Sequence, residues 1–164
     1  MTRRPVANET VTSGGLTDMI NYRSAVLNAS SLATIAGNKT ATVNVGYLAI
    51  PATDYASVID VDGSFWCELG ATADWSVRFG YDTAADPGAT GTGTPGATLQ
   101  RDYLHNPFGT PVKRTANVSG KFTLAANTAA WIRMLAVRTA GTLTIGTPIG
   151  LVLNAHRTEI FPAA

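Results

Sequence analysis

The chain has 164 residues, a net charge of +1 and a single cysteine, and only 14% of its residues are charged. A near-neutral chain lacks the basic footprint of a nucleic-acid-binding protein, and one cysteine excludes an intrachain disulfide. Soluble domains usually contain about 25% charged residues, so a surface this poor in charge favours self-association, which would cover part of it.

The apolar segments of the chain are short. No run approaches the roughly 18 apolar residues of a membrane-spanning helix, and residues 1–5 lack the apolar stretch of a secretion signal. We therefore expect a soluble protein with no membrane partner, built as one domain with an additional terminal segment.

The N-terminal 39 residues are predicted to be an attachment segment. Residues 1–15 have the character of an extended arm, and a short helix is predicted to follow and to end between Asn28 and Ser31. An isolated helix of this length is marginal, so it must pack on the domain, a sister copy or a larger assembly. The candidate partner-binding residues are Arg3, Arg4, Leu16, Met19, Ile20, Tyr22 and Arg23.

Residues 40–164 alternate apolar and polar side chains with the period of β-strands. The pattern predicts an all-β fold, an antiparallel β-sandwich or jelly roll of eight to ten strands, preceded by the arm and the helix. The clearest half-buried strand runs from Trp75 to Tyr81, and the run 131–138, apolar on both faces, predicts a central strand. Asp62-Gly63 lies between two apolar runs and predicts a hairpin turn.

Residues 83–98 are rich in Gly, Pro and Thr and predict a long loop. Loops of this length in compact domains are often functional or mobile. The candidate surface-recognition residues are Tyr55, Pro87, Pro95 and Tyr103. Trp66, Trp75 and Trp131 lie within apolar runs, so we interpret them as core residues rather than as a carbohydrate-stacking surface.

The sequence predicts no catalytic residue, no cofactor and no metal ligand set. Asp60 to Gly63 resembles the start of a calcium loop, but the twelfth position, where a bidentate Glu is required, is Ala71. His105 and His156 lack neighbours at ligand spacing. Cys67 lies in an apolar run and is interpreted as a small buried hydrophobe.

Three segments of the chain resemble small virion proteins of tailed bacteriophages, especially those that infect actinobacteria. They are RPVANET at residues 4–10 with LTDMINYR at 16–23, WIRMLAVR at 131–138, and RTEIFP at 157–162. The run 131–138 also resembles the late strands of trimeric knob domains similar to tumour necrosis factor.

The resemblance implies a homotrimeric, non-enzymatic structural protein of the virion, assembled in the host cytoplasm. Its partners would be copies of itself and the major capsid protein or a tail protein. The chain has no long repetitive shaft, which favours a capsid decoration or minor capsid protein that binds the outer shell through its N-terminal segment. The alternative is a receptor-binding knob or a minor tail or fibre protein, and a third hypothesis is an enzyme or small-ligand binder on a β-sandwich.

Overall fold

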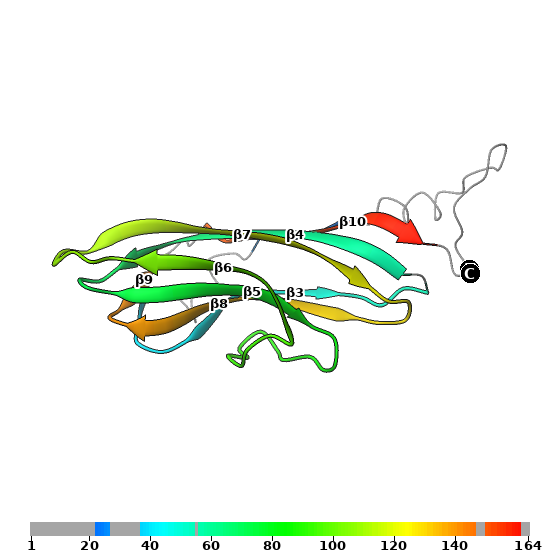
Figure 1. Ribbon diagram of the computed structural model, residues 1–164, viewed down its shortest axis with the longest axis horizontal. Coiled ribbons are helices and arrows are strands. Elements are labelled where there is room, and N and C mark those ends of the chain that lie inside the picture. The colour runs from blue at the N-terminus through cyan, green and yellow to red at the C-terminus, as the bar shows by residue number, and fades with distance from the viewer. Residues whose placement is uncertain (1–21, 27–36, 55, 147–149, 162–164) are drawn as a thin grey trace.

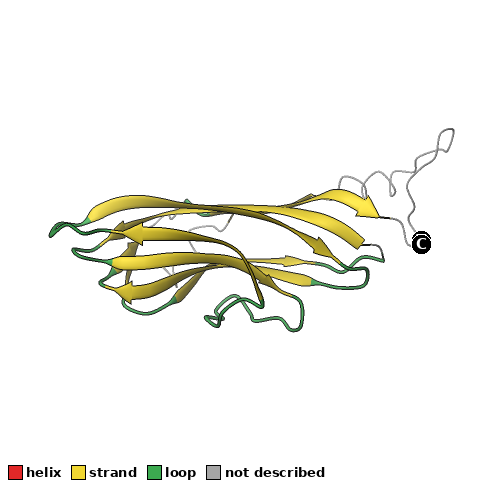
Figure 2. Cartoon of the chain, viewed as in Figure 1, coloured by secondary structure: helices red, strands yellow, loops and turns green. Residues whose placement is uncertain are grey.

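The computed structural model of the chain describes residues 22–26, 37–54, 56–146 and 150–161, which form two stacked antiparallel sheets (Figure 1). All regular elements in these ranges are strands (Figure 2), which confirms the predicted all-β class. The described part of the chain accordingly has no helix that is long and apolar enough to cross a membrane.

The first sheet has six strands and is organised around the 14-residue strand β4. β7 pairs along one edge of β4, while β10 and the short β9 pair with its other edge. β1 then pairs with β10, and β2 pairs with β9. The bounds are β1 (Tyr22–Val26), β2 (Gly37–Lys39), β4 (Ala56–Leu69), β7 (Val112–Leu124), β9 (Leu143–Ile145) and β10 (Val152–Phe161).

The second sheet has four strands in the order β3-β8-β5-β6. β8 is central, as its two apolar faces predict, and β5 coincides with the predicted strand from Trp75 to Tyr81. The bounds are β3 (Val43–Ile50), β5 (Asp74–Asp82), β6 (Ala97–His105) and β8 (Ala130–Ala140).

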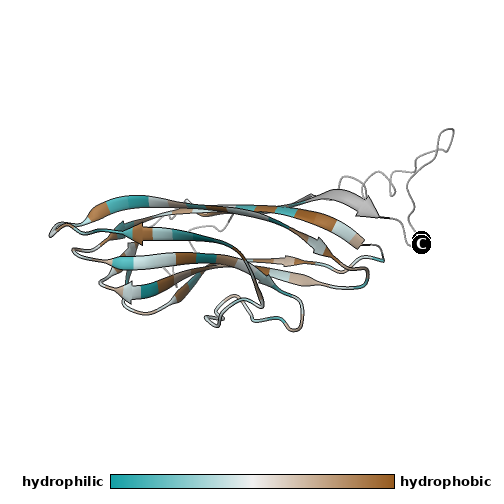
Figure 3. Cartoon of the chain, in the orientation of Figure 1, coloured by the Kyte–Doolittle hydropathy of each residue, from teal (hydrophilic) through white to brown (hydrophobic). Residues whose placement is uncertain are grey.

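The main core lies between the two sheets. Apolar and polar residues alternate along the strands (Figure 3), so that Phe65 and Cys67 of β4 and Trp75 and Phe79 of β5 are fully buried or nearly so. Burying one such large side chain contributes about 1.5–3 kcal/mol. Trp75 is thus a core residue as predicted, whereas Trp66 and Trp131 are only half-buried.

Cys67 is confirmed as a buried hydrophobe. Its side chain is fully enclosed, and burial raises the pKa of the thiol to about 12. The thiol is therefore protonated at neutral pH and is not a nucleophile.

Residues 22–26 are a strand, so the prediction of a helix there is wrong. Tyr22 to Val26 pair in register with Val152 to His156 of β10, a contact between segments far apart in the sequence. This pairing supplies backbone partners that override a weak helical pattern. β1 and β2 both fall within the predicted attachment segment, and both are strands of the first sheet.

The predicted hairpin turn at Asp62-Gly63 is also wrong, because β4 continues through both residues. Gly63 pairs with Val118 on one side and Leu153 on the other. A Cβ atom at Gly63 would lie 3.3 Å from Leu153 Cδ1 and 3.4 Å from Met134 Cε. The glycine therefore permits close packing between the sheets instead of a positive φ in a turn.

Side chains of β6 close one side of the sandwich. β6 and β7 are edge strands of the two sheets, and the Asn117 N–H donates to Asp102 Oδ2 at 3.4 Å. The Ser119 N–H donates to Gln100 Oε1. These bonds give acceptors to edge N–H groups that would otherwise be open to pairing with another chain.

We predict that Gly80→Ala lowers the free energy of unfolding by about 1–3 kcal/mol. A Cβ atom at Gly80 would overlap the carbonyl oxygen of Ala97 and lie 2.8 Å from Pro95 Cβ, so the start of β6 must move. Gly93→Ala is the matched control, because nothing lies within 4 Å of its Cβ position. Urea denaturation followed by tryptophan fluorescence measures both, and equal stabilities would contradict the prediction.

Candidate functional site

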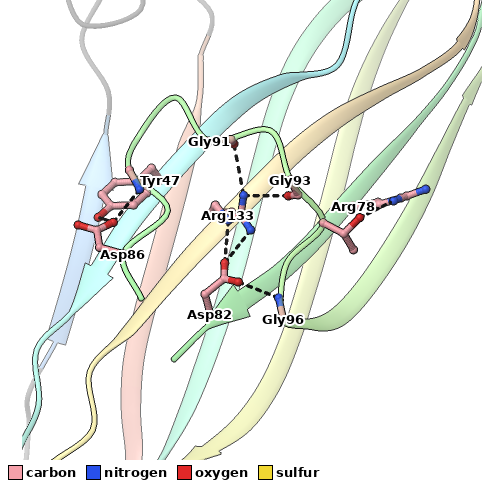
Figure 4. Close-up of polar contacts among 10 residues, drawn as sticks. Tyr47, Arg78, Asp82, Asp86, Gly91, Gly93, Gly96 and Arg133 are labelled. Carbon is pink, nitrogen blue, oxygen red and sulfur yellow. Dashed lines mark hydrogen bonds and ion pairs between the residues drawn. The ribbon is translucent and has the colours of Figure 1, made fainter. Parts of the chain in front are cut away.

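The loop from Thr83 to Gly96 joins β5 to β6 and folds back over the outer face of the second sheet (Figures 1 and 4). The sequence predicted a loop here, and the structure confirms it. Of the recognition candidates in the loop, Pro95 is buried and Pro87 is half-buried.

The loop is anchored by Arg133, which projects from the outer face of β8 (Figure 4). Its Nε and Nη2 atoms lie 2.8 Å and 2.7 Å from Asp82 Oδ2. Nη1 donates to the carbonyl oxygens of Gly93 at 2.9 Å and Gly91 at 3.3 Å. Asp82 Oδ1 in turn accepts from the Gly96 N–H at 2.8 Å, so one ion pair holds both ends of the loop.

The ion pair is almost removed from water. The Arg133 side chain is 3% exposed and that of Asp82 is 18% exposed. The free-energy cost of removing two charges from water is offset only when further hydrogen bonds satisfy the charged groups. The carbonyl groups of the loop accept the remaining hydrogen bonds of Arg133. Leu135, the next outward residue of β8, is fully buried but lies outside the main core.

A second anchor joins the loop to β3. The Tyr47 hydroxyl donates to Asp86 Oδ1 at 2.6 Å, and the Gly88 N–H donates to the same oxygen at 2.8 Å (Figure 4). Burial and the bond to Asp86 raise the pKa of Tyr47 to about 12. The bonds from Tyr47 and Gly88 lower the pKa of Asp86. Both shifts stabilise the neutral phenol and the ionised carboxylate together.

The outer face of the first sheet carries a shallow polar hollow of about 470 Å³. Asp62 is the ionisable residue of its lining, and Asp62 Oδ2 accepts from Asn154 Nδ2 at 3.1 Å. Such a surface offers hydrogen bonds to a hydroxyl-rich ligand. The lining residues are Asp62, Gly63, Ser64, Gln100, Asn117, Val118 and Ser119.

Most of the predicted partner-binding residues lie outside the described ranges. These are Arg3, Arg4, Leu16, Met19 and Ile20. Tyr55, one of the recognition candidates, also lies outside the described ranges. Tyr22 and Arg23 belong to β1.

Among the predicted recognition residues that the structure describes, Tyr103 is the one that is well exposed, at 71%. It lies on β6, two residues before His105, whose Nδ1 lies 3.9 Å from Asp74 Oδ1. Across the described ranges, no group of three or more His, Cys, Asp or Glu side chains gathers where it could hold a metal ion.

The sequence analysis missed the anchors of the loop. One signal was available: Arg133 interrupts the apolar run from Trp131 to Val137, and a buried guanidinium needs a carboxylate partner. The sequence does not say which carboxylate, since Asp82 lies 51 residues away.

Comparisons with known proteins leave the chain without a family. No protein-family model matches the sequence, and no curated protein is significantly similar to it.

We predict that Arg133→Met lowers the free energy of unfolding by about 3–5 kcal/mol, because it leaves the partly buried Asp82 carboxylate without its cation. Arg114→Met is the control, since Arg114 is an exposed residue of β7. Both are measured by chemical denaturation. A loss no larger in Arg133→Met than in the control would show that the ion pair does not hold the loop.

We predict that the Tyr47–Asp86 anchor is lost in strong base. The raised pKa means that the folded state favours the neutral phenol of Tyr47. The contribution of the Tyr47–Asp86 hydrogen bond to stability is therefore complete below the ordinary tyrosine pKa of about 10, and it disappears as the pH rises through about 12. Absorbance titration near 295 nm should show a phenolate step near pH 12 that Tyr47→Phe removes. If the step that the substitution removes lies near pH 10, the anchor is not formed in solution.

Proposed function

We propose that the chain is a structural protein of a bacteriophage virion, a trimeric capsid decoration or minor capsid protein. It would bind the outer shell through the residues that precede β1. The virion setting and the trimer come from the resemblance of the segments at 4–10, 16–23, 131–138 and 157–162, and the order of strand pairing supports the virion setting.

The strand pairs nest inside one another. β5 pairs with β6, β4 with β7, β3 with β8, and finally β2 with β9 and β1 with β10. The first four pairs alternate between the second and the first sheet, and the fifth pair, β1 with β10, lies in the first sheet like the fourth. We interpret this as a single long hairpin rolled up on itself, which is the jelly roll.

The observation that carries the proposal is the nested strand pairing, which we interpret as a jelly roll. The jelly roll is a common architecture of viral capsid domains, and also of lectin domains, so the step from fold to role is an analogy. The buried polar groups hold parts of the fold together, which agrees with a structural role. Arg133 and Asp82 fasten a loop, and Asn106, fully buried, donates to the carbonyl oxygens of Gly70 and Thr110 at 2.8 Å and 2.9 Å.

A receptor-binding knob on the phage tail is the second candidate. The exposed ring of Tyr103 favours it, because a fixed aromatic side chain is a ready contact surface for a receptor.

We predict that removing residues 1–21 abolishes binding to particles that lack the protein, while the sandwich stays folded. The truncation keeps β1, which belongs to the first sheet. Full-length protein, the truncation and Arg3→Gln/Arg4→Gln would be compared by co-sedimentation with such particles, with at least tenfold weaker binding expected for the truncation. Circular dichroism checks the fold, and sedimentation velocity checks the trimer.

Arg114→Gln, which changes an exposed residue of β7, is the matched control and should bind like the unaltered protein. Undiminished co-sedimentation of the truncated protein would refute attachment through this segment. If particles assembled without the protein look normal but no longer adsorb to host cells, the result would favour the knob instead.

A further inference from the structure

We propose that Arg78, Arg101 and Tyr103 form a binding site for a carboxylated sugar residue of an acidic polysaccharide. The site lies on the outer face of the second sheet, beside the anchored loop. It is additional to the proposed structural role and does not rest on it.

The site begins with two arginines that face each other across neighbouring strands. Arg78 of β5 and Arg101 of β6 are direct partners in the antiparallel register. Val77 and Phe79, on either side of Arg78, are fully buried in the core, so Arg78 and its partner face outward. Like charges directly opposite each other destabilise a sheet, so this pair needs an explanation.

The two guanidinium groups have no carboxylate partner among the described residues. Nη1 of Arg78 lies 3.2 Å from the Thr94 hydroxyl of the loop (Figure 4), and its buried Nε donates to no described acceptor. Asp102, adjacent to Arg101 in sequence, accepts from the N–H groups of Tyr103 at 2.8 Å and Asn117 at 3.4 Å. It is therefore directed to the β7 edge rather than to the arginines.

Two other nearby carboxylates lie next to side chains other than Arg78 and Arg101. Asp82 is held by Arg133 at 2.7 Å, and Asp74 lies 3.9 Å from His105 Nδ1. Within the described ranges, the surface around Arg78 and Arg101 thus has positive charge that no carboxylate compensates. An anion placed between the two side chains would remove their repulsion. A carboxylate suits them well, because its two oxygens match the fork of guanidinium N–H donors.

Tyr103 indicates which kind of carboxylated ligand the site would bind. It faces outward two residues beyond Arg101 on β6 and pairs across the strands with Ser76. Residues two apart on one face of a strand lie about 7 Å apart, so the ring and the arginines are within reach of one sugar residue. With 71% of the side chain exposed, the ring can lie against the C–H face of a pyranose, while the hydroxyls of Ser76 and Thr94 supply hydrogen bonds.

The composition of the site favours a sugar over other anions. Inorganic phosphate would use the arginines but not the aromatic ring. Nucleic acid needs a broad basic surface, which a chain of net charge +1 does not provide. Both Arg101 and Tyr103 lie on a strand, so their backbone is already ordered and only their exposed side chains lose freedom on binding.

We predict that the full-length protein binds an oligosaccharide of galacturonic acid at least tenfold more tightly than a neutral galactose oligosaccharide of equal length. Arg101→Gln and Tyr103→Ala should each weaken that binding at least tenfold. Arg114→Gln, which changes an exposed arginine on β7, should bind normally. Isothermal titration calorimetry measures the affinities, and thermal unfolding checks that each variant is folded.

Separate arms with inorganic phosphate and a short poly-glutamate peptide test the alternative anions. Equal affinity for the acidic and neutral sugars, or no binding at all, would overturn the proposal. So would a loss on Arg101→Gln without a loss on Tyr103→Ala, or poly-glutamate binding as tight as that of the sugar, since these identify a general anion or acidic-peptide site. The measurements use no virus particles, so their outcome is independent of the attachment experiment.

Discussion

The guanidinium of Arg133 is nearly fully buried on β8, and its need for oxygen acceptors determines where the loop from Thr83 to Gly96 lies. Asp82 supplies the charge, and the carbonyl groups of Gly91 and Gly93 supply the remaining acceptors. The glycine-rich composition of the loop fits this use, because small residues let backbone carbonyls approach a side chain closely. The loop is consequently part of the folded structure and carries Thr94 to its place beside Arg78.

Protection of the sheet edge and the surplus charge on the second sheet have a common cause. Asp102 and Gln100 are used to cap N–H groups of β7, which blunts an edge that could otherwise pair with another chain. Because Asp102 is turned to that edge, it does not neutralise its neighbour Arg101. The charge imbalance beside Tyr103 is therefore a consequence of how the sandwich is closed.

Local periodicity was enough to predict much of the second sheet. β5 and β8 follow from alternating apolar residues, and the Gly- and Pro-rich stretch correctly predicted the loop between β5 and β6. The errors arose where a local signal has two physical meanings. Gly63 could allow a turn or a close contact, and only its neighbours Leu153 and Met134, remote in the sequence, distinguish the two. Tyr22 to Val26 form a strand because β10 pairs with them.

The nested pairing also has a consequence for how the chain folds. The innermost pair, β5 and β6, is separated by one loop, whereas β1 pairs with β10 at the register Tyr22↔His156. Contacts between distant segments slow folding, because the chain entropy of the long enclosed segment is lost before the contact stabilises. On the ribosome β1 emerges before the other described strands, and its partner β10 emerges after them. The pairing of β1 with β10 therefore forms only after all the strands between them have been made.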